Sequence, residues 1–180
     1  PLEDCAVQHD RLEETEGDMD KAEILLRKRG AEAAHKKAGR TLGSGVVVSY
    51  IHNNQIGAMV LLSCETDFVA KNDEFIALAQ KIAQQVAATN PTYRSVEDIP
   101  EEVKEKAAQT FTPELKGKPA EMHEKILAGK LSAYFKDQVL LEQEDIRDPS
   151  MTIRGHIDAA IQKFGERIEI GNMTRFSTRG

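Results

Sequence analysis

The sequence predicts an α+β fold in which helices cover one face of a small antiparallel sheet. Two apolar runs, residues 46–51 and 56–64, are separated by four polar residues, and the first run is rich in β-branched side chains. Such a pair is typical of an antiparallel hairpin. A further strand is expected near the C-terminus, where Ile168 and Ile170 alternate with charged residues and the pattern extends towards Phe176.

The helices that should cover this sheet have clear start and stop signals. The best one spans residues 72–88, with Asn72 as its N-cap and Asn90 beyond its end. A second opens at 149–150 and closes at Gly165. Their apolar stripes are Phe75, Leu78, Ala79, Ile82 and Val86 in the first, and Ile153, Ile157, Ala160, Ile161 and Phe164 in the second.

Between these two helices the signals are weaker. Helices are expected at residues 101–109 and at 119–136, where Pro119 suits a helix start and Gly129 lies in the middle. The apolar run 139–141 is compatible with either another strand or a buried helix end.

The N-terminal part predicts two short helices. The first begins at Asp18 and ends at Gly30, and the second covers residues 31–38. Their basic residues are interpreted either as cations near a helix C-terminus or as a docking surface for an acidic partner. The expected division is a helical module at 1–39 and a core domain at 40–180. Because the chain starts at Pro1 rather than Met, part of the natural N-terminus is expected to be missing.

Composition narrows the class of protein. The chain has 180 residues, with 24 basic and 30 acidic side chains and a formal net charge of -6, which argues against a dedicated nucleic-acid binder. Cys5 and Cys64 match no metal or redox spacing and are expected to be reduced thiols. The longest purely apolar run, 58–62, is far too short to span a bilayer.

No recognised catalytic signature is present, so neither an enzyme nor a bound cofactor is expected. Gly39, Gly43 and Gly45 lack the Lys-Ser or Lys-Thr that follows a phosphate-binding loop. His123-Glu124 begins like a zinc-protease motif, but Leu127 stands where the second histidine would be needed.

One segment, residues 65–72, is the candidate site because it must turn the chain between a strand and the best helix. Phe68 lies in it between Asp67 and Lys71. If Phe68 packs inward, it closes the strand–helix corner; if it points outward, it is a rigid apolar anchor for a partner. The acidic residues nearby favour helix capping over a metal or acid–base site. They are Glu65, Asp67, Asp73 and Glu74.

The segment Cys64–Phe75, which reads CETDFVAKNDEF, resembles the signature of the elongation factor Ts family. Residues 17–30 resemble the last helix of that family's ubiquitin-associated-like N-terminal module, here only partly present. Further matches lie at 34–39, 118–121, 129–131, 140–143 and 165–168. The chain has room for one core subdomain, so it is similar to the short members, which pair as homodimers.

The resemblance implies a function in protein biosynthesis. The chain would be a non-enzymatic guanine nucleotide exchange factor for elongation factor Tu. It would act in the bacterial cytoplasm or, if it is an organellar protein, in the mitochondrial matrix or the plastid stroma. It further implies that the Asp67-Phe68 pair enters the GTPase domain near the Mg²⁺ and nucleotide site. The implied partner-binding residues are Thr66, Asp67, Phe68, Val69, Ala70, Lys71 and Asn72.

Two other hypotheses remain beside this one. The first is an interaction module that recruits an acidic partner through residues 1–39. The second is a small enzyme that uses Glu65, Asp67 and Asp73 around a metal ion.

Overall fold

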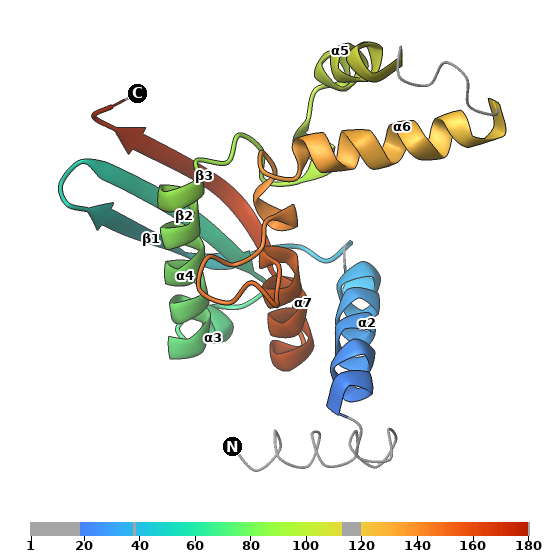
Figure 1. Cartoon of the computed structure of the whole chain (residues 1–180). Coiled ribbons are helices and arrows are strands. Elements are labelled where there is room, and N and C mark those ends of the chain that lie inside the picture. The colour runs from blue at the N-terminus through green and yellow to red at the C-terminus, as the bar shows by residue number, and fades with distance from the viewer. Residues whose placement is uncertain (1–18, 38, 113–119, 180) are drawn as a thin grey trace.

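The computed structural model describes residues 19–37, 39–112 and 120–179 and confirms the α+β class (Figure 1). The expectations for Cys5, Asp18 and Pro119 lie outside the described residues. The elements in chain order are α2 (Met19–Lys37), β1 (Ser44–His52), β2 (Ile56–Cys64), α3 (Asp67–Ala70), α4 (Asp73–Thr89), η1 (Val96–Asp98), α5 (Glu101–Phe111), α6 (Ala120–Phe135), η3 (Leu140–Glu142), α7 (Ile153–Phe164) and β3 (Glu169–Ser177).

The sheet has three antiparallel strands in the order β1-β2-β3, so the hairpin and the C-terminal strand are both confirmed. Asn53 and Asn54 have φ values of 49° and 55° and form the turn between β1 and β2. Asparagine tolerates this left-handed conformation, and Asn53 and Asn54 together with Gln55 make the three-residue loop between the paired strand ends His52 and Ile56. The Gln55 N–H donates to the His52 carbonyl at 3.0 Å and closes the turn.

One face of the sheet is covered by α4, and α7 packs beside α4 in the same core (Figure 1). The Asn72 side chain caps α4 by accepting from the Glu74 N–H at 2.9 Å, and Asn90 ends the helix in the left-handed conformation, both as predicted. α7 begins at Ile153, a few residues after the expected opening at 149–150, and Thr152 is its N-cap. The shared core consists of inward-facing residues of the strands and of both helices, including Val48, Val60, Leu62, Phe75, Ala79, Ile82, Ile153, Ile157 and Ile161.

The prediction of two N-terminal helices divided at Gly30 is wrong, because α2 runs unbroken from Met19 to Lys37. Gly30 is buried where α2 passes α7, and a Cβ there would lie 3.3 Å from both the Cβ and the carbonyl oxygen of Asp158. The glycine therefore permits close packing of two helices instead of ending one. A glycine within a helix costs only about 1 kcal/mol, which tertiary packing can offset.

Helices α5 and α6 form a pair that stands away from the sheet (Figure 1). A second, smaller cluster of Ile99, Ala107, Phe135 and Val139 lies at its base. The 139–141 run is neither a full strand nor a helix end: Val139 makes an isolated parallel bridge to Tyr93, and η3 follows directly. Among the described helices, none is both long and apolar enough to cross a membrane.

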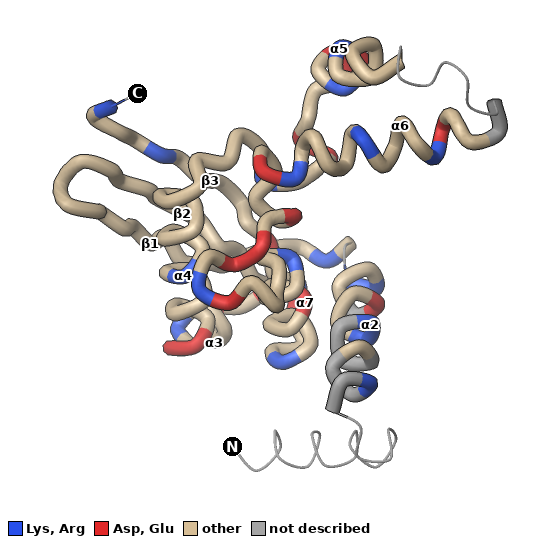
Figure 2. The backbone as a smooth tube through the Cα atoms, in the orientation of Figure 1, with Lys and Arg blue, Asp and Glu red and all other residues tan. Residues whose placement is uncertain are grey.

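Charged residues are unevenly distributed along the chain. Figure 2 shows lysines, arginines and acidic residues on the helices and connections, whereas the hairpin is free of them. From Thr41 to Cys64 the sequence contains no Lys, Arg, Asp or Glu. The face of the sheet opposite α4 exposes four large apolar side chains, which are Val47, Ile51, Met59 and Phe176. This uncharged face is distinct from the loop that carries the candidate site.

Candidate functional site

The candidate site is the segment that joins β2 to α4, and its centre is the single helical turn α3. The Thr66 side chain caps this turn by accepting from the Val69 N–H at 3.5 Å. Lys71 ends it with an N–H that donates to the Asp67 carbonyl at 3.1 Å. Asn72 then caps α4. Both ends of the loop are therefore fixed by side-chain or backbone hydrogen bonds, of which the sequence predicts the Asn72 cap.

Within this turn, Phe68 and Val69 have opposite environments. The Phe68 side chain is 80 % exposed, whereas Val69 is 3 % exposed and belongs to the core that includes Phe75 and Leu62. Ala70 is partly buried against the same core. Val69 thus closes the strand–helix corner, and the alternative in which Phe68 is the structural plug is wrong.

Asp67 and Lys71 flank Phe68 with an ion pair across one helical turn. The Lys71 Nζ donates to Asp67 Oδ2 at 2.7 Å, and both side chains are largely exposed. This hydrogen bond from Lys71 holds the pKa of the Asp67 carboxyl below its ordinary value, and the ammonium charge adds to the effect. Together with Phe68, Asn72 and Asp73, the pair lines an open depression.

The other carboxylates near the loop point to separate partners. Glu74 accepts from Lys163 Nζ at 2.7 Å. Glu65 Oε1 accepts from the Arg167 N–H at 2.6 Å and from Arg40 at 3.3 Å. The Arg167 N–H, followed by Arg40, lowers the pKa of the Glu65 carboxyl. Across the described residues, no three His, Cys, Asp or Glu side chains are grouped so that they could hold a metal ion.

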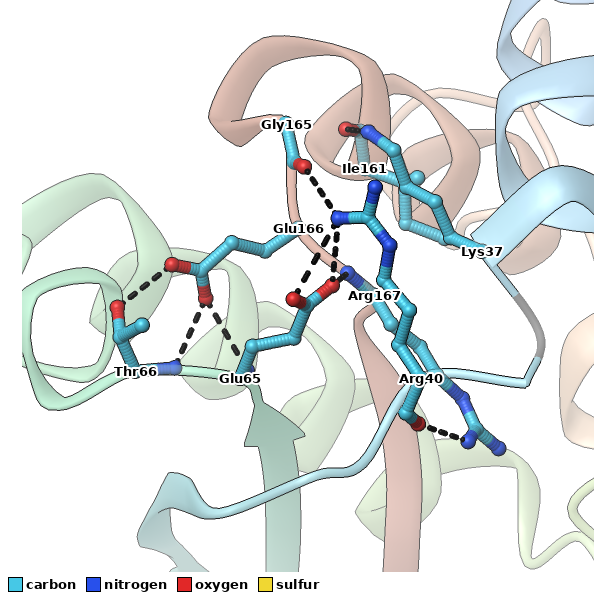
Figure 3. Close-up of polar contacts among 8 residues, drawn as sticks. All are labelled: Lys37, Arg40, Glu65, Thr66, Ile161, Gly165, Glu166 and Arg167. Carbon is cyan, nitrogen blue, oxygen red and sulfur yellow. Dashed lines mark hydrogen bonds and ion pairs between the residues drawn. The ribbon is translucent and has the colours of Figure 1, made fainter.

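The base of the loop is fixed by residues far away in the sequence (Figure 3). Arg167 Nη1 donates to the Arg40 carbonyl at 2.6 Å, and Glu166 accepts from the backbone at the loop entry. The patterns that identify single elements do not reveal these contacts. The sequence signals at Glu166 and Arg167 are their position after Gly165, the predicted helix end, and the resemblance of residues 165–168 to the family.

Cys64 stands at the start of the loop as a buried thiol. Its Sγ donates to the Thr66 carbonyl at 3.1 Å. Burial raises the pKa of this thiol, so the thiolate that would react or bind a metal is disfavoured. Cys64 therefore behaves as a small core residue.

The end of α2 favours one of the two interpretations of the basic residues. His35, Lys36 and Lys37 occupy the last turn of the helix, where the helix dipole favours cations. Lys37 Nζ also donates to the Ile161 carbonyl at 3.4 Å (Figure 3). At least this lysine stabilises helix packing within the chain.

Comparisons with known proteins identify the family of this chain. The family described as Elongation factor TS matches residues 26–179. A protein named elongation factor Ts from Thermotoga neapolitana is 46% identical over 166 residues, which are 92% of this chain and 84% of the relative. Proteins of the same name from Thermodesulfovibrio yellowstonii and Carboxydothermus hydrogenoformans are each 46% identical over 92% of this chain, covering 83% and 77% of those relatives. The chain belongs to the elongation factor Ts family.

Proposed function

We propose that this protein is a guanine nucleotide exchange factor for elongation factor Tu and that it acts through the Asp67-Phe68 turn. The observation that carries the proposal is the exposure of Phe68, at 80 %, on a turn that is capped by Thr66 and held to the core by buried Val69. A large exposed aromatic side chain on a rigid support is the kind of residue that dominates interface energies. Asp67 and Lys71 beside it provide polar groups that can set the approach of a partner.

The activity requires no covalent chemistry. An exchange factor needs only to bind the nucleotide-free form of the GTPase more tightly than its GDP-bound form. By thermodynamic reciprocity, GDP must then weaken binding of the factor to the same extent. The membership in the elongation factor Ts family and the placement of Phe68 support this function over a metal-dependent enzyme.

The energies involved show that Phe68 acts together with a wider surface. Acceleration of GDP release by about 10⁴-fold requires roughly 5.5 kcal/mol of differential stabilisation. A buried aromatic anchor contributes on the order of 2 to 4 kcal/mol. Other surfaces of the protein therefore hold the partner in its open form while Phe68 inserts.

We also infer that two copies pair through the exposed face of the sheet. This face carries Val47, Ile51, Met59 and Phe176, and no charged residue lies between 41 and 64. In a twofold interface the same patch meets itself, so an uncharged apolar face suits a second copy of the chain. The loop with Phe68 lies outside this patch, so pairing would leave it free.

The pairing has a direct test by analytical ultracentrifugation. The Ile51→Lys variant would bring like charges together across the interface and is expected to shift the protein from dimer to monomer. Val96 is also an exposed apolar residue, but it lies on η1, so Val96→Lys is the matched control. An unchanged dimer in the Ile51→Lys protein, or a monomeric wild type, would exclude this arrangement.

The exchange function itself is tested by stopped-flow release of a fluorescent GDP analogue from elongation factor Tu. Addition of the wild-type protein is expected to accelerate release by orders of magnitude, in proportion to its concentration until saturation. Release that stays at the intrinsic rate, with a folded factor and an active GTPase, would refute the proposed function.

A further inference from the structure

The entry of the loop is held by the side chain of a residue about a hundred positions away. Glu166 Oε2 accepts from the N–H groups of Glu65 and Thr66, both at 3.0 Å. Its other oxygen, Oε1, accepts from the Thr66 hydroxyl at 2.6 Å. One half-buried carboxylate therefore binds three donors of the loop (Figure 3).

The contacts between Glu166 and the loop entry are matched by contacts in the other direction, and we call the two sets together the clamp. While Glu166 binds the backbone of residues 65 and 66, Glu65 binds the backbone of the next residue after Glu166. Its Oε1 accepts from the Arg167 N–H at 2.6 Å, and the same carboxylate pairs with Arg40. The two corners, at the end of β2 and before β3, thus satisfy each other's backbone donors. Charge-assisted hydrogen bonds of this kind are about twice as strong as neutral ones.

Thr66 transmits this clamp to the turn that carries Phe68. Its hydroxyl hydrogen goes to Glu166, which leaves an oxygen lone pair directed at the Val69 N–H. A helix of one turn is not stable by itself, because its nucleation is unfavourable. The direction in which Phe68 leaves the surface therefore depends on the Thr66 cap and on the burial of Val69.

We propose that Glu166 is a positioning residue for the loop of residues 65–72 and that it holds Phe68 in a fixed orientation towards the partner. This inference rests on the proposed exchange function. Glu166 does not line the depression around Phe68, which is formed by Asp67, Phe68, Lys71, Asn72 and Asp73. Its effect is exerted through Thr66, and a loop that is ordered in advance loses less conformational entropy on binding.

The test compares Glu166→Ala with Glu166→Gln in the stopped-flow GDP-release assay, at a series of factor concentrations. The Ala variant removes all three acceptor contacts and is expected to lower the maximal release rate about tenfold or more, as small misplacements do. We expect its half-saturating concentration to change by less than about threefold, because the wider surface is intact. The Gln variant retains one oxygen for the two N–H groups and is expected to keep most of the maximal rate.

Glu144→Ala is the matched control. Glu144 is an exposed glutamate whose carboxylate pairs with Lys136 at 2.8 Å, away from the loop. Its loss removes the same charge and is expected to leave the maximal rate unchanged. A simple effect of net charge would instead slow both Ala variants equally, and that result would overturn the positioning role.

Hydrogen exchange of the free protein provides a readout that does not need the partner. In Glu166→Ala, the amides of Glu65, Thr66 and Val69 are expected to exchange about tenfold faster, whereas amides inside α4 keep their protection. If Glu166→Ala is globally unfolded, Thr66→Val carries the test, because it removes the hydroxyl bridge to Glu166 together with the cap on the Val69 N–H through which Glu166 acts, and it is likewise expected to lower the maximal rate.

Two further results would be decisive. A maximal rate in Glu166→Ala equal to that of an active wild type would overturn the positioning role alone. A wild type that does not accelerate release at all would refute the exchange function and this inference with it.

Discussion

Phe68 and Val69 are neighbours in the sequence, yet one is 80 % exposed and the other 3 % exposed. The turn α3 places the two side chains in opposite environments, Val69 in the core beneath the loop and Phe68 in solvent. Val69 therefore supports the fold, whereas Phe68 is accessible to a partner. Substitutions at the two sites should have opposite consequences.

Phe68→Ala is expected to leave the free energy of unfolding within about 0.5 kcal/mol of the wild-type value. An exposed side chain loses little when it is truncated, because it buries little apolar area in the folded state. Urea denaturation followed by circular dichroism measures this difference. A loss of more than about 1.5 kcal/mol would mean that Phe68 contributes to the core in solution.

Val69→Ala provides the matched comparison. Removal of two buried methyl groups is expected to lower the free energy of unfolding by about 1.5 to 3 kcal/mol, through lost burial and the cavity that remains. The same denaturation experiment applies. Equal stabilities of the two variants would contradict the assignment of Val69 as the residue that closes the corner.

Two glycines of the hairpin should respond differently to substitution by alanine. A Cβ at Gly45 would lie 2.5 Å from the Leu62 carbonyl oxygen, whereas at Gly57 the nearest atom is Ile51 Cγ1 at 4.0 Å. Gly45→Ala must displace backbone and is expected to cost about 1 to 3 kcal/mol. Gly57→Ala is expected to be neutral or to stabilise by about 0.5 kcal/mol, because alanine loses less entropy on folding.

Thermal unfolding of both glycine variants by calorimetry distinguishes these effects. A lower Tm in Gly57→Ala than in Gly45→Ala would show that the register of β1 on β2 differs from the one described. The comparison is matched because both glycines lie in the pairing of β1 with β2, where Gly45 is opposite Ser63 and Gly57 is opposite Ile51.

Buried Gln85 is expected to be important for the segment between η3 and α7. Its side chain donates to Gln143 Oε1 and to the Glu144 carbonyl and accepts from the Ile146 N–H, all at 3.0 Å. Gln85→Leu leaves these groups without their partner and should cost about 2 to 3 kcal/mol. Chemical denaturation measures the loss.

Gln84 is the control for this substitution. Its Oε1 is buried but has no hydrogen-bond partner in the part of the chain that the structure describes. Gln84→Met should therefore be neutral or slightly stabilising. If Gln84→Met destabilises as much as Gln85→Leu, the hydrogen-bond network is not the cause of the effect.

The pKa of Glu65 predicts a pH dependence of stability. Because hydrogen bonds from the Arg167 N–H and Arg40 lower this pKa in the folded state, the ionised carboxylate stabilises the fold. That contribution is fully present above about pH 5 and is lost as the pH falls through the lower pKa of the folded state. The stability difference between wild type and Glu65→Gln should therefore shrink as the pH is lowered below about 5. A difference independent of pH would contradict this assignment.

The local elements of this fold could be predicted because each has its own signal. The bounds of β2 and the caps of α4 follow from residues within or next to each element. The predicted helix end at Gly30 is wrong because a glycine is typical both of a helix end and of a close contact between helices, and only the position of Asp158 distinguishes the two.

The loop of the candidate site can be singled out from the sequence, but the contacts that support it cannot. Phe68 stands out in a strand–helix loop, although the sequence left both of its orientations open. The clamp between Glu65 and Glu166 joins positions about a hundred residues apart, and its geometry depends on how β2 and β3 pair. No local pattern encodes such a contact, so it emerges only from the assembled sheet.

The most direct test of the account is the rate at which elongation factor Tu releases a fluorescent GDP analogue with saturating wild type or Phe68→Ala. Loss of an aromatic anchor worth about 2 to 4 kcal/mol predicts a rate about 30- to 900-fold lower for the variant, with its fold intact. Equal rates for the two proteins would contradict the central claim that the exposed Phe68 drives nucleotide release.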